Sequence, residues 1–244
     1  MFNKKVMLII AIMTVSLMII PLQAQSTLTY GDIVTGELTN DEFEVEYTFE
    51  SATGDVIIVE MTPVDALGDL NSPELILLGT DNRVLTDTSG GFNIGSAVLV
   101  AEIPVDGTYT IIAGRRDGRA GDSVGEFTLE LIQPEEITID IPIEGSVSSE
   151  GRSQYYLVQS STTFAVSYEK MMGEMSPQVS VNTLSDDSGG LEEIATAQGD
   201  ELTIATLGNF SASTTYIVSV GEALFDFNFR EVTAGFTLQL QLND

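Results

Sequence analysis

Apolar and polar residues alternate with a period of two along most of the chain after residue 26. In GEFTLEL (125–131), phenylalanine and leucine hold one set of alternate positions, and glutamate and threonine hold the other. Because successive side chains of a strand point to opposite faces, this pattern predicts a half-buried strand. Clusters of Gly, Asp, Asn and Ser interrupt these segments, as turns between strands require. No long segment has the period and end caps of an amphipathic helix, so the pattern predicts an all-β protein.

The same series of strands occurs twice. The strand GEFTLEL is matched by AGFTLQL (234–240), and GTYTIIAG (107–114) is matched by TTYIVSVG (214–221). Other features recur in the same order and at nearly constant spacing: a glycine (Gly36, Gly145), an apolar segment (55–61, 163–169) and a proline before a strand (Pro73, Pro177). We infer an internal duplication, and we call the two halves copy one and copy two.

Each copy is long enough to bury a core of its own. Many short strands in each copy favour a sandwich of two sheets. We therefore predict two tandem antiparallel β-sandwich domains, at residues 27–134 and 135–244. The junction IQPEE (132–136) is too short for a flexible tether, so we expect the domains to sit end to end with limited freedom.

Residues 1–26 have the composition of a leader. Two lysines precede an apolar segment (6–20) that ends at Pro21, and Ala24 offers a cleavage point. This order is typical of a secretory signal peptide. The alternative is an uncleaved anchor, but a spanning helix needs about 20 apolar residues and this segment is shorter. We expect a secreted protein, or one held at the cell surface without a covalent link.

The charge balance is strongly acidic, with 37 Asp and Glu against 9 Lys and Arg and a formal net charge of −28. Such a charge repels phosphate backbones and anionic lipid headgroups, so nucleic acid is not expected as a partner, nor a membrane except through an uncleaved leader. Mutual repulsion also favours a monomer. The chain has no Cys, and an exported protein without disulfides fits a bacterial source.

The segments GDVIIVEM, SPELILL, IPVDGTYTIIAG and GEFTLEL, in this order after a G…G.L pattern, resemble the bacterial pre-peptidase C-terminal domain. The resemblance covers residues 28–131 well and 137–240 more loosely. It implies a jelly-roll-like β-sandwich in each copy, of a kind commonly attached to secreted peptidases. The matching motifs are structural, and a shared fold alone does not establish a function.

The residue inventory excludes much catalytic chemistry. The chain has no His and no Cys, which rules out a Ser-His-Asp triad, thiol nucleophiles and zinc sites built on these residues. Two carboxylates are enough for a glycosidase, and this remains the enzymatic alternative. Otherwise we expect no enzyme and no cofactor.

Calcium is the one metal that the residue types allow, because it prefers hard oxygen ligands. The weak candidates are Asp65 and Asp69 in one loop and Asp117 and Asp122 in another. Neither loop has the spacing of an EF-hand. We favour the alternative that these residues form solvated turns.

The loop after the tyrosine strand differs most between the copies. Copy one has GRRDGRAGD there, with three arginines, and copy two has GEALFDFNFRE, with three alternating phenylalanines: Arg115, Arg116, Arg119, Phe225, Phe227 and Phe229. The arginines either contact an acidic partner or neutralise nearby carboxylates, and we favour the second. The phenylalanines either form a platform for sugar rings or point into the core, and we again favour the second.

These observations predict an exported, non-catalytic bacterial protein that acts as an extracellular binding or structural module. The alternatives are a carbohydrate-binding accessory protein of a secreted hydrolase system and a carboxylate-based hydrolase. The expected partner is an extracellular protein or a glycan, which the sequence does not identify.

Overall fold

The computed structural model describes residues 26–65, 68–89, 96–148, 153–173, 177–184, 190–198, 204–222 and 233–242. Copy one contains β1 Ser26–Leu28, β2 Ile33–Leu38, β3 Glu44–Ser51, β4 Val56–Pro63, β5 Pro73–Leu78, β6 Val84–Ser89, β7 Ala97–Glu102, β8 Gly107–Arg115, a 3₁₀ turn at Gly118–Ala120, and β9 Gly125–Ile132. Copy two contains β10 Glu135–Glu136, β11 Ile143–Ser148, β12 Gln154–Gln159, β13 Phe164–Gly173, β14 Pro177–Leu184, β15 Leu191–Gln198, β16 Ile204–Phe210, β17 Thr215–Glu222 and β18 Thr233–Leu242. The expected leader, apart from its last residue, lies outside the described residues.

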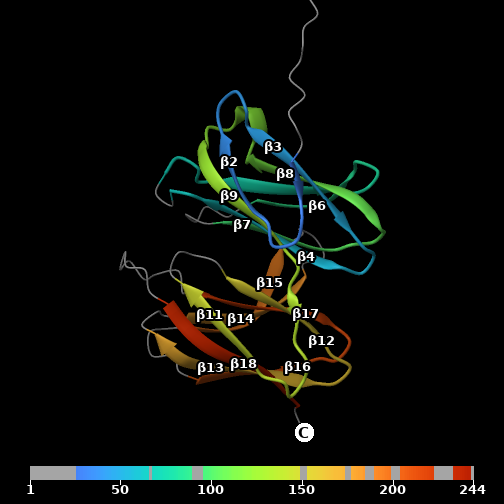
Figure 1. Ribbon diagram of the computed structural model, residues 1–244, viewed down its shortest axis with the longest axis vertical. Coiled ribbons are helices and arrows are strands. Elements are labelled where there is room, and N and C mark those ends of the chain that lie inside the picture. The colour runs from blue at the N-terminus through green and yellow to red at the C-terminus, as the bar shows by residue number, and fades with distance from the viewer. Residues whose placement is uncertain are drawn as a thin grey trace, which may run out of the picture.

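Each copy is a sandwich of a five-stranded and a four-stranded sheet (Figure 1). In copy one the strand orders are β1-β3-β8-β5-β6 and β2-β9-β4-β7. In copy two they are β10-β12-β17-β14-β15 and β11-β18-β13-β16, which is the same order strand for strand. The prediction of two tandem β-sandwiches is confirmed, and the matched topology is what a duplication requires.

The first strand of each copy was not predicted. Strand β1 runs parallel to β3, and β10 runs parallel to β12, whereas the sequence predicted antiparallel sheets only. Ser26, which we assigned to the leader, is the first residue of β1 and pairs with Tyr47. The sandwich of copy one therefore includes a residue that the sequence analysis placed in the leader. Among the described residues, no helix is long and apolar enough to cross a membrane.

The alternating pattern of the sequence accounts for the two cores. On β9, Phe127, Leu129 and Leu131 are fully buried between the sheets of copy one, and on β18 Phe236, Leu238 and Leu240 are buried in copy two. The recurring tyrosines also have equivalent roles. The Tyr109 hydroxyl donates a hydrogen bond to the Val105 carbonyl at 2.6 Å, and the Tyr216 hydroxyl donates one to the Ser211 carbonyl at 3.3 Å.

The recurring glycine is explained by the recurring phenylalanine. Gly36 on β2 is paired with Phe127 on β9, and Gly145 on β11 is paired with Phe236 on β18. A Cβ atom at either glycine would collide with the ring of its phenylalanine partner and with the hydroxyl of a core tyrosine. The aromatic ring therefore lies across the glycine in both copies, so the pairing needs a residue without a side chain.

Candidate functional site

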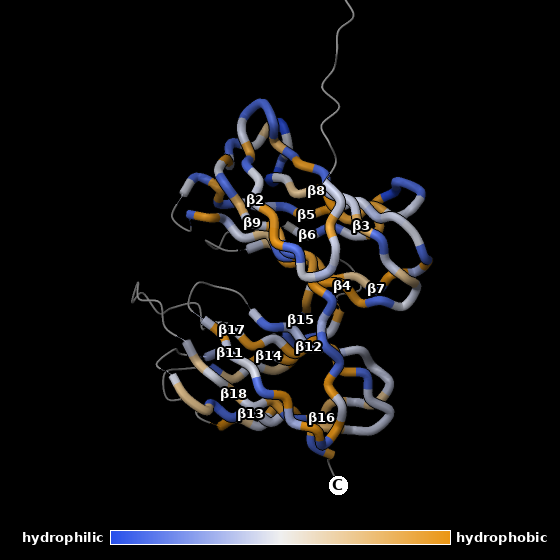
Figure 2. The backbone as a smooth tube through the Cα atoms, viewed as in Figure 1, coloured by the Kyte–Doolittle hydropathy of each residue, from blue (hydrophilic) through white to orange (hydrophobic). Residues whose placement is uncertain are grey.

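The two sandwiches pack against each other through sheet faces. The outer face of the four-stranded sheet of copy one contributes Val56, Ile58 and Val100, and the outer face of the five-stranded sheet of copy two contributes Tyr155 and Ile217. These side chains form one buried cluster. We call this contact the interdomain interface. Figure 2 shows the apolar segment at β4 where the two sandwiches meet.

The interface explains why β4 is apolar on both faces. Every residue from Val56 to Met61 is buried, because alternate side chains point into the core of copy one and toward copy two. A strand covered on both faces has a continuous apolar run instead of strict alternation. This run was the signal in the sequence, in DVIIVEM, for a second covered face.

The outer face of the five-stranded sheet is more apolar in copy two than in copy one at the two positions that enter the interface. Tyr155 on β12 occupies the position that Glu46 holds on β3, and Ile217 on β17 occupies the position of Thr110 on β8. Glu46 is exposed and Thr110 is half-buried, whereas Tyr155 and Ile217 are buried. The residue differences between the copies therefore make this sheet face suitable for burial in copy two and not in copy one.

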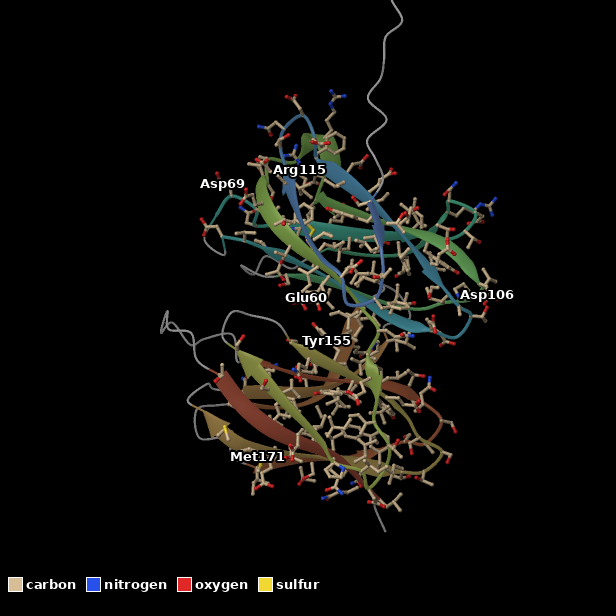
Figure 3. The ribbon with its side chains drawn as sticks, viewed as in Figure 1. Glu60, Asp69, Asp106, Arg115, Tyr155 and Met171 are labelled. Atoms are coloured by element: carbon tan, nitrogen blue, oxygen red, sulfur yellow. The ribbon has the colours of Figure 1, made fainter. Side chains whose placement is uncertain are left out.

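Tyr155 and Glu60 form a polar contact within the interface. The Tyr155 hydroxyl donates a hydrogen bond to Glu60 Oε2 at 3.4 Å, and both residues lie where the sandwiches meet (Figure 3). Glu60 is only 6% exposed. Burial raises the pKa of Tyr155 well above its ordinary value, and the negative charge of Glu60 raises it further. The phenol therefore stays protonated and remains a donor at physiological pH.

A groove runs beside the interface, along the segment that joins the copies. Its volume is about 670 Å³. It is lined by the end of β9 and the residue after it, by β10, and by residues from β11 and from the start of β12: Glu130, Ile132, Gln133, Glu135, Glu144, Gly145, Ser146, Ser153, Gln154, Tyr155 and Tyr156. We call this space the interdomain groove. No basic side chain is found among these lining residues.

The wall of the groove in copy two is held by its own hydrogen bonds. The Tyr156 hydroxyl donates to Gln154 Oε1 at 2.7 Å, and Gln154 Nε2 donates to the Ser146 carbonyl at 2.7 Å. Burial raises the pKa of Tyr156 to about 12, and the charge of Glu135 adds to this effect. Tyr156 is therefore a neutral donor that fixes the orientation of Gln154 in the groove wall.

Arg115 was one of the candidate binding residues, and its burial does not support that role. This residue is the last of β8, follows the inward-pointing Ala113, and is 1% exposed. Its Nε donates to the Gly118 carbonyl at 2.8 Å and its Nη1 to the Ser123 carbonyl at 3.1 Å. Arg115 therefore stabilises the β8–β9 loop by hydrogen bonds to its backbone and is too buried to contact an acidic partner.

The other two arginines lie nearer the surface. Arg119 is exposed, and Arg116 is half-buried close to Glu74. Burial raises the pKa of Glu74, Asp87 adds to the rise, and the charge of Arg116 partly offsets it. This placement of Arg116 favours neutralisation of nearby carboxylates over contact with a partner.

The two calcium candidate loops lie at the same end of copy one. The Ser123 hydroxyl accepts a hydrogen bond from the backbone N–H of Asn71 at 3.0 Å and donates one to the backbone carbonyl of Asp69 at 3.3 Å, so it joins the two loops. Figure 3 shows Asp69 and Arg115 at this end. A cavity of about 420 Å³ there is lined in part by Asp65 and Asp69 but not by Asp117 or Asp122. Across the described residues, no three potential metal-ligating side chains come together. The sequence did not predict that the loops would meet.

The phenylalanine candidates of copy two are not placed. Phe225, Phe227 and Phe229 lie outside the described residues, between β17 and β18. Whether they point into the core or form a platform stays a prediction. The described residues that come together at a groove are instead those of the interdomain groove, which the sequence did not single out.

The sequence matches no protein-family model, and no curated protein matches it either. Among solved structures, the pre-peptidase C-terminal domain of collagenase from Bacillus anthracis is similar, at 16% identity and a TM-score of 0.33, over 44% of this chain and 93% of that one. The N-terminal tandem of CBM22 modules from Paenibacillus barcinonensis Xyn10C is 8% identical, with a TM-score of 0.29, over 89% of this chain and 99% of that one. The PBSX exported protein XepA is 10% identical, with a TM-score of 0.28, over 87% and 88% of the two chains.

The collagenase domain is a pre-peptidase C-terminal domain, and its match covers less than half of this chain. At such identities and TM-scores the comparisons carry no functional argument. The function proposed below rests on the interdomain interface and the groove beside it.

Proposed function

We propose that this chain is an exported, non-catalytic module that binds an extracellular partner or ligand as a single two-sandwich body. The observation that carries this proposal is the interdomain interface. Tyr155 and Ile217 of copy two are buried against β4, and copy one has no such apolar side chains at the equivalent positions. A contact specified in this way holds the copies in one arrangement and shapes the groove between them.

Export is supported by the N-terminal sequence. Two lysines, an apolar segment and Ala24 have the order of a secretory leader, and the first strand among the described residues begins at Ser26, close after that cleavage point. A high negative charge and the lack of Cys are compatible with a soluble bacterial protein outside the cell. Any partner is expected to be neutral or basic, because an acidic one would be repelled.

A non-catalytic role is supported by the chemistry that remains. Without His and Cys, the carboxylate pair is the main catalytic option. One carboxylate pair beside the groove is Glu60 and Glu130, which lie directly opposite each other on β4 and β9. Glu60 is buried beneath the Tyr155 hydroxyl, so it has no open path to a substrate. This arrangement does not favour a glycosidase.

Expression of the full chain with its own leader in a bacterium tests the proposal. We expect the protein in the medium or at the cell surface, with an N-terminus created after Ala24. The purified protein is then assayed against polysaccharide, peptide and ester substrates, and we expect no turnover. Retention in the cytoplasm would contradict export. Turnover that Glu130→Gln abolishes would show that the protein is a carboxylate-based enzyme.

A further inference from the structure

We propose that the interdomain groove is a binding site for a neutral polyhydroxy ligand, a short segment of an oligosaccharide. This inference rests on the proposed function, since it names the ligand class of a binding module. The groove differs from the phenylalanine platform considered from the sequence, because it is built by β9, β10, β11 and β12. Its volume of about 670 Å³ falls within the range of about 300–1,000 Å³ usual for small-ligand sites.

The position of the groove is one argument. Ligand sites occur preferentially where two domains meet. One side of this groove comes from copy one and the joining segment (Glu130, Gln133), and the other side comes from copy two (Glu144, Gln154). Since the interface buries Tyr155 and Ile217 beside it, the two sides are held at a set separation before any ligand arrives. A site that is already formed needs little ordering on binding.

The chemical groups in the groove are the second argument. Carboxylates at Glu130, Glu135 and Glu144 accept hydrogen bonds, and the amides of Gln133 and Gln154 offer both acceptors and donors. Each hydroxyl of a sugar is also both donor and acceptor. A polyol can therefore donate to the carboxylates and accept from the amides at once, whereas a ligand that only accepts hydrogen bonds can use the amides alone.

The third argument is that the Gln154 amide in the groove wall already has a fixed orientation. Gln154 is held by the Tyr156 hydroxyl on one side and by the Ser146 carbonyl on the other, so its amide does not have to be ordered by the ligand. Gly145 faces this pair without a side chain, and a Cβ atom there would approach Gln154 Oε1 to 2.6 Å. A side chain at this position would push Gln154 out of its place, so the glycine preserves the orientation of the amide in the groove wall.

The charge of the lining narrows the ligand class. Three carboxylates and no basic residue line the groove, so sulfated, phosphorylated or uronic-acid ligands are repelled. A cationic amine is the rival that charge alone would favour. The two are separated by their response to salt and to amide substitution, because only a cation depends on the negative charge itself.

The experiment uses the full secreted chain. A glycan array of neutral, acidic and amino oligosaccharides selects the probe, and calorimetry with the best neutral oligosaccharide gives its Kd. We expect Glu135→Ala/Glu144→Ala to weaken binding by about tenfold or more, as loss of a hydrogen bond to a charged group does. Glu135→Gln/Glu144→Gln keeps acceptors in place and is expected to weaken binding by about threefold at most. Raising the salt concentration should leave the Kd of the wild type unchanged.

Glu102→Ala/Glu136→Ala is the matched control. It removes the same charge from two exposed positions outside the groove, one of them next to Glu135. We expect its Kd to equal that of the wild type, and the unfolding midpoints of all variants to agree. The inference is overturned if no neutral glycan binds, if the control weakens binding as much as the groove variant, or if only amines bind and both salt and the Gln variant abolish their binding. The proposed function fails separately, through cytoplasmic retention or enzymatic turnover.

Discussion

At the scale of single residues, the clearest cause of the fold is the glycine–phenylalanine pair in each copy. Gly145 lies under the Phe236 ring, and any Cβ there must displace the ring or the Tyr156 hydroxyl. We expect Gly145→Ala to lower the free energy of unfolding by about 1–3 kcal/mol, the usual cost of overpacking. Urea denaturation measures this change.

The control for this prediction is Gly208→Ala. A Cβ at Gly208 would lie 3.6 Å from the Ala165 Cβ, which is an ordinary contact on the neighbouring strand. We expect little change in stability there. Equal losses at the two glycines would show that the cost comes from glycine replacement in a strand and not from the aromatic ring.

A second residue-scale prediction concerns Tyr168, which is fully buried and stacked on Phe236. Its hydroxyl has no hydrogen-bond partner among the described residues, and burial raises its pKa to about 12. Because an unpaired buried hydroxyl is costly, we expect Tyr168→Phe to leave the free energy of unfolding unchanged or to raise it by up to about 1 kcal/mol.

Tyr109→Phe is the comparison for Tyr168→Phe. It removes a hydroxyl that donates to the Val105 carbonyl at 2.6 Å, so we expect a loss of about 0.5–1.5 kcal/mol. Both variants are measured by the same urea titration. A loss for Tyr168→Phe as large as that for Tyr109→Phe would mean that the Tyr168 hydroxyl has a stabilising partner.

At the scale of strands and sheets, the copies diverge where one of them is covered. Ile217 on β17 is fully buried in the interface, and its equivalent in copy one is Thr110. We expect Ile217→Thr to cost about 2–3 kcal/mol, since it removes apolar contacts and buries a hydroxyl. The reverse change, Thr110→Ile, should alter stability by less than about 0.5 kcal/mol. Similar costs for both changes in urea unfolding would contradict a copy-specific interface.

Much of this level was predictable from sequence. Among the strands that show the duplication, β5, β8 and β9 alternate clearly and bury one face each. Strand β4 is buried on both faces and has a continuous apolar run instead. The edge strands β15 and β16 were missed, because nearly all of their residues are exposed or half-buried and no apolar face marks them. The short parallel strands β1 and β10 are too brief to show any period.

The site was less predictable, for two physical reasons. Arg115 continues the inward series of Tyr109, Ile111 and Ala113 on β8, so the alternation did contain its burial, but its charge suggested a surface role. The interdomain groove depends on how two folded units pack. Only the two-sided apolar run of β4 hinted at that packing, and no local pattern specified which groups would line the groove.

At the scale of the whole molecule, folding is not expected to depend on a metal ion. The two aspartate loops of copy one are joined by Ser123, and among the described residues no group of metal-ligating side chains forms. We expect EDTA to leave the Tm unchanged. A ligand at a hundred times its Kd stabilises by about 2.7 kcal/mol, which amounts to a shift of several degrees. A fall of that size, reversed by calcium, would assign a site to the loop of Asp65 and Asp69.

The central claim is that the two copies form one rigid body, and a distance between them tests it most directly. Because the chain has no Cys, spin labels can be placed at Arg83→Cys in copy one and Glu169→Cys in copy two. Arg83 is 86% exposed, and Glu169 lies exposed on β13. Pulsed electron–electron double resonance should give a single narrow distribution of distances between the two labels. A broad distribution, or two populations, would show that the sandwiches move independently and would contradict the account.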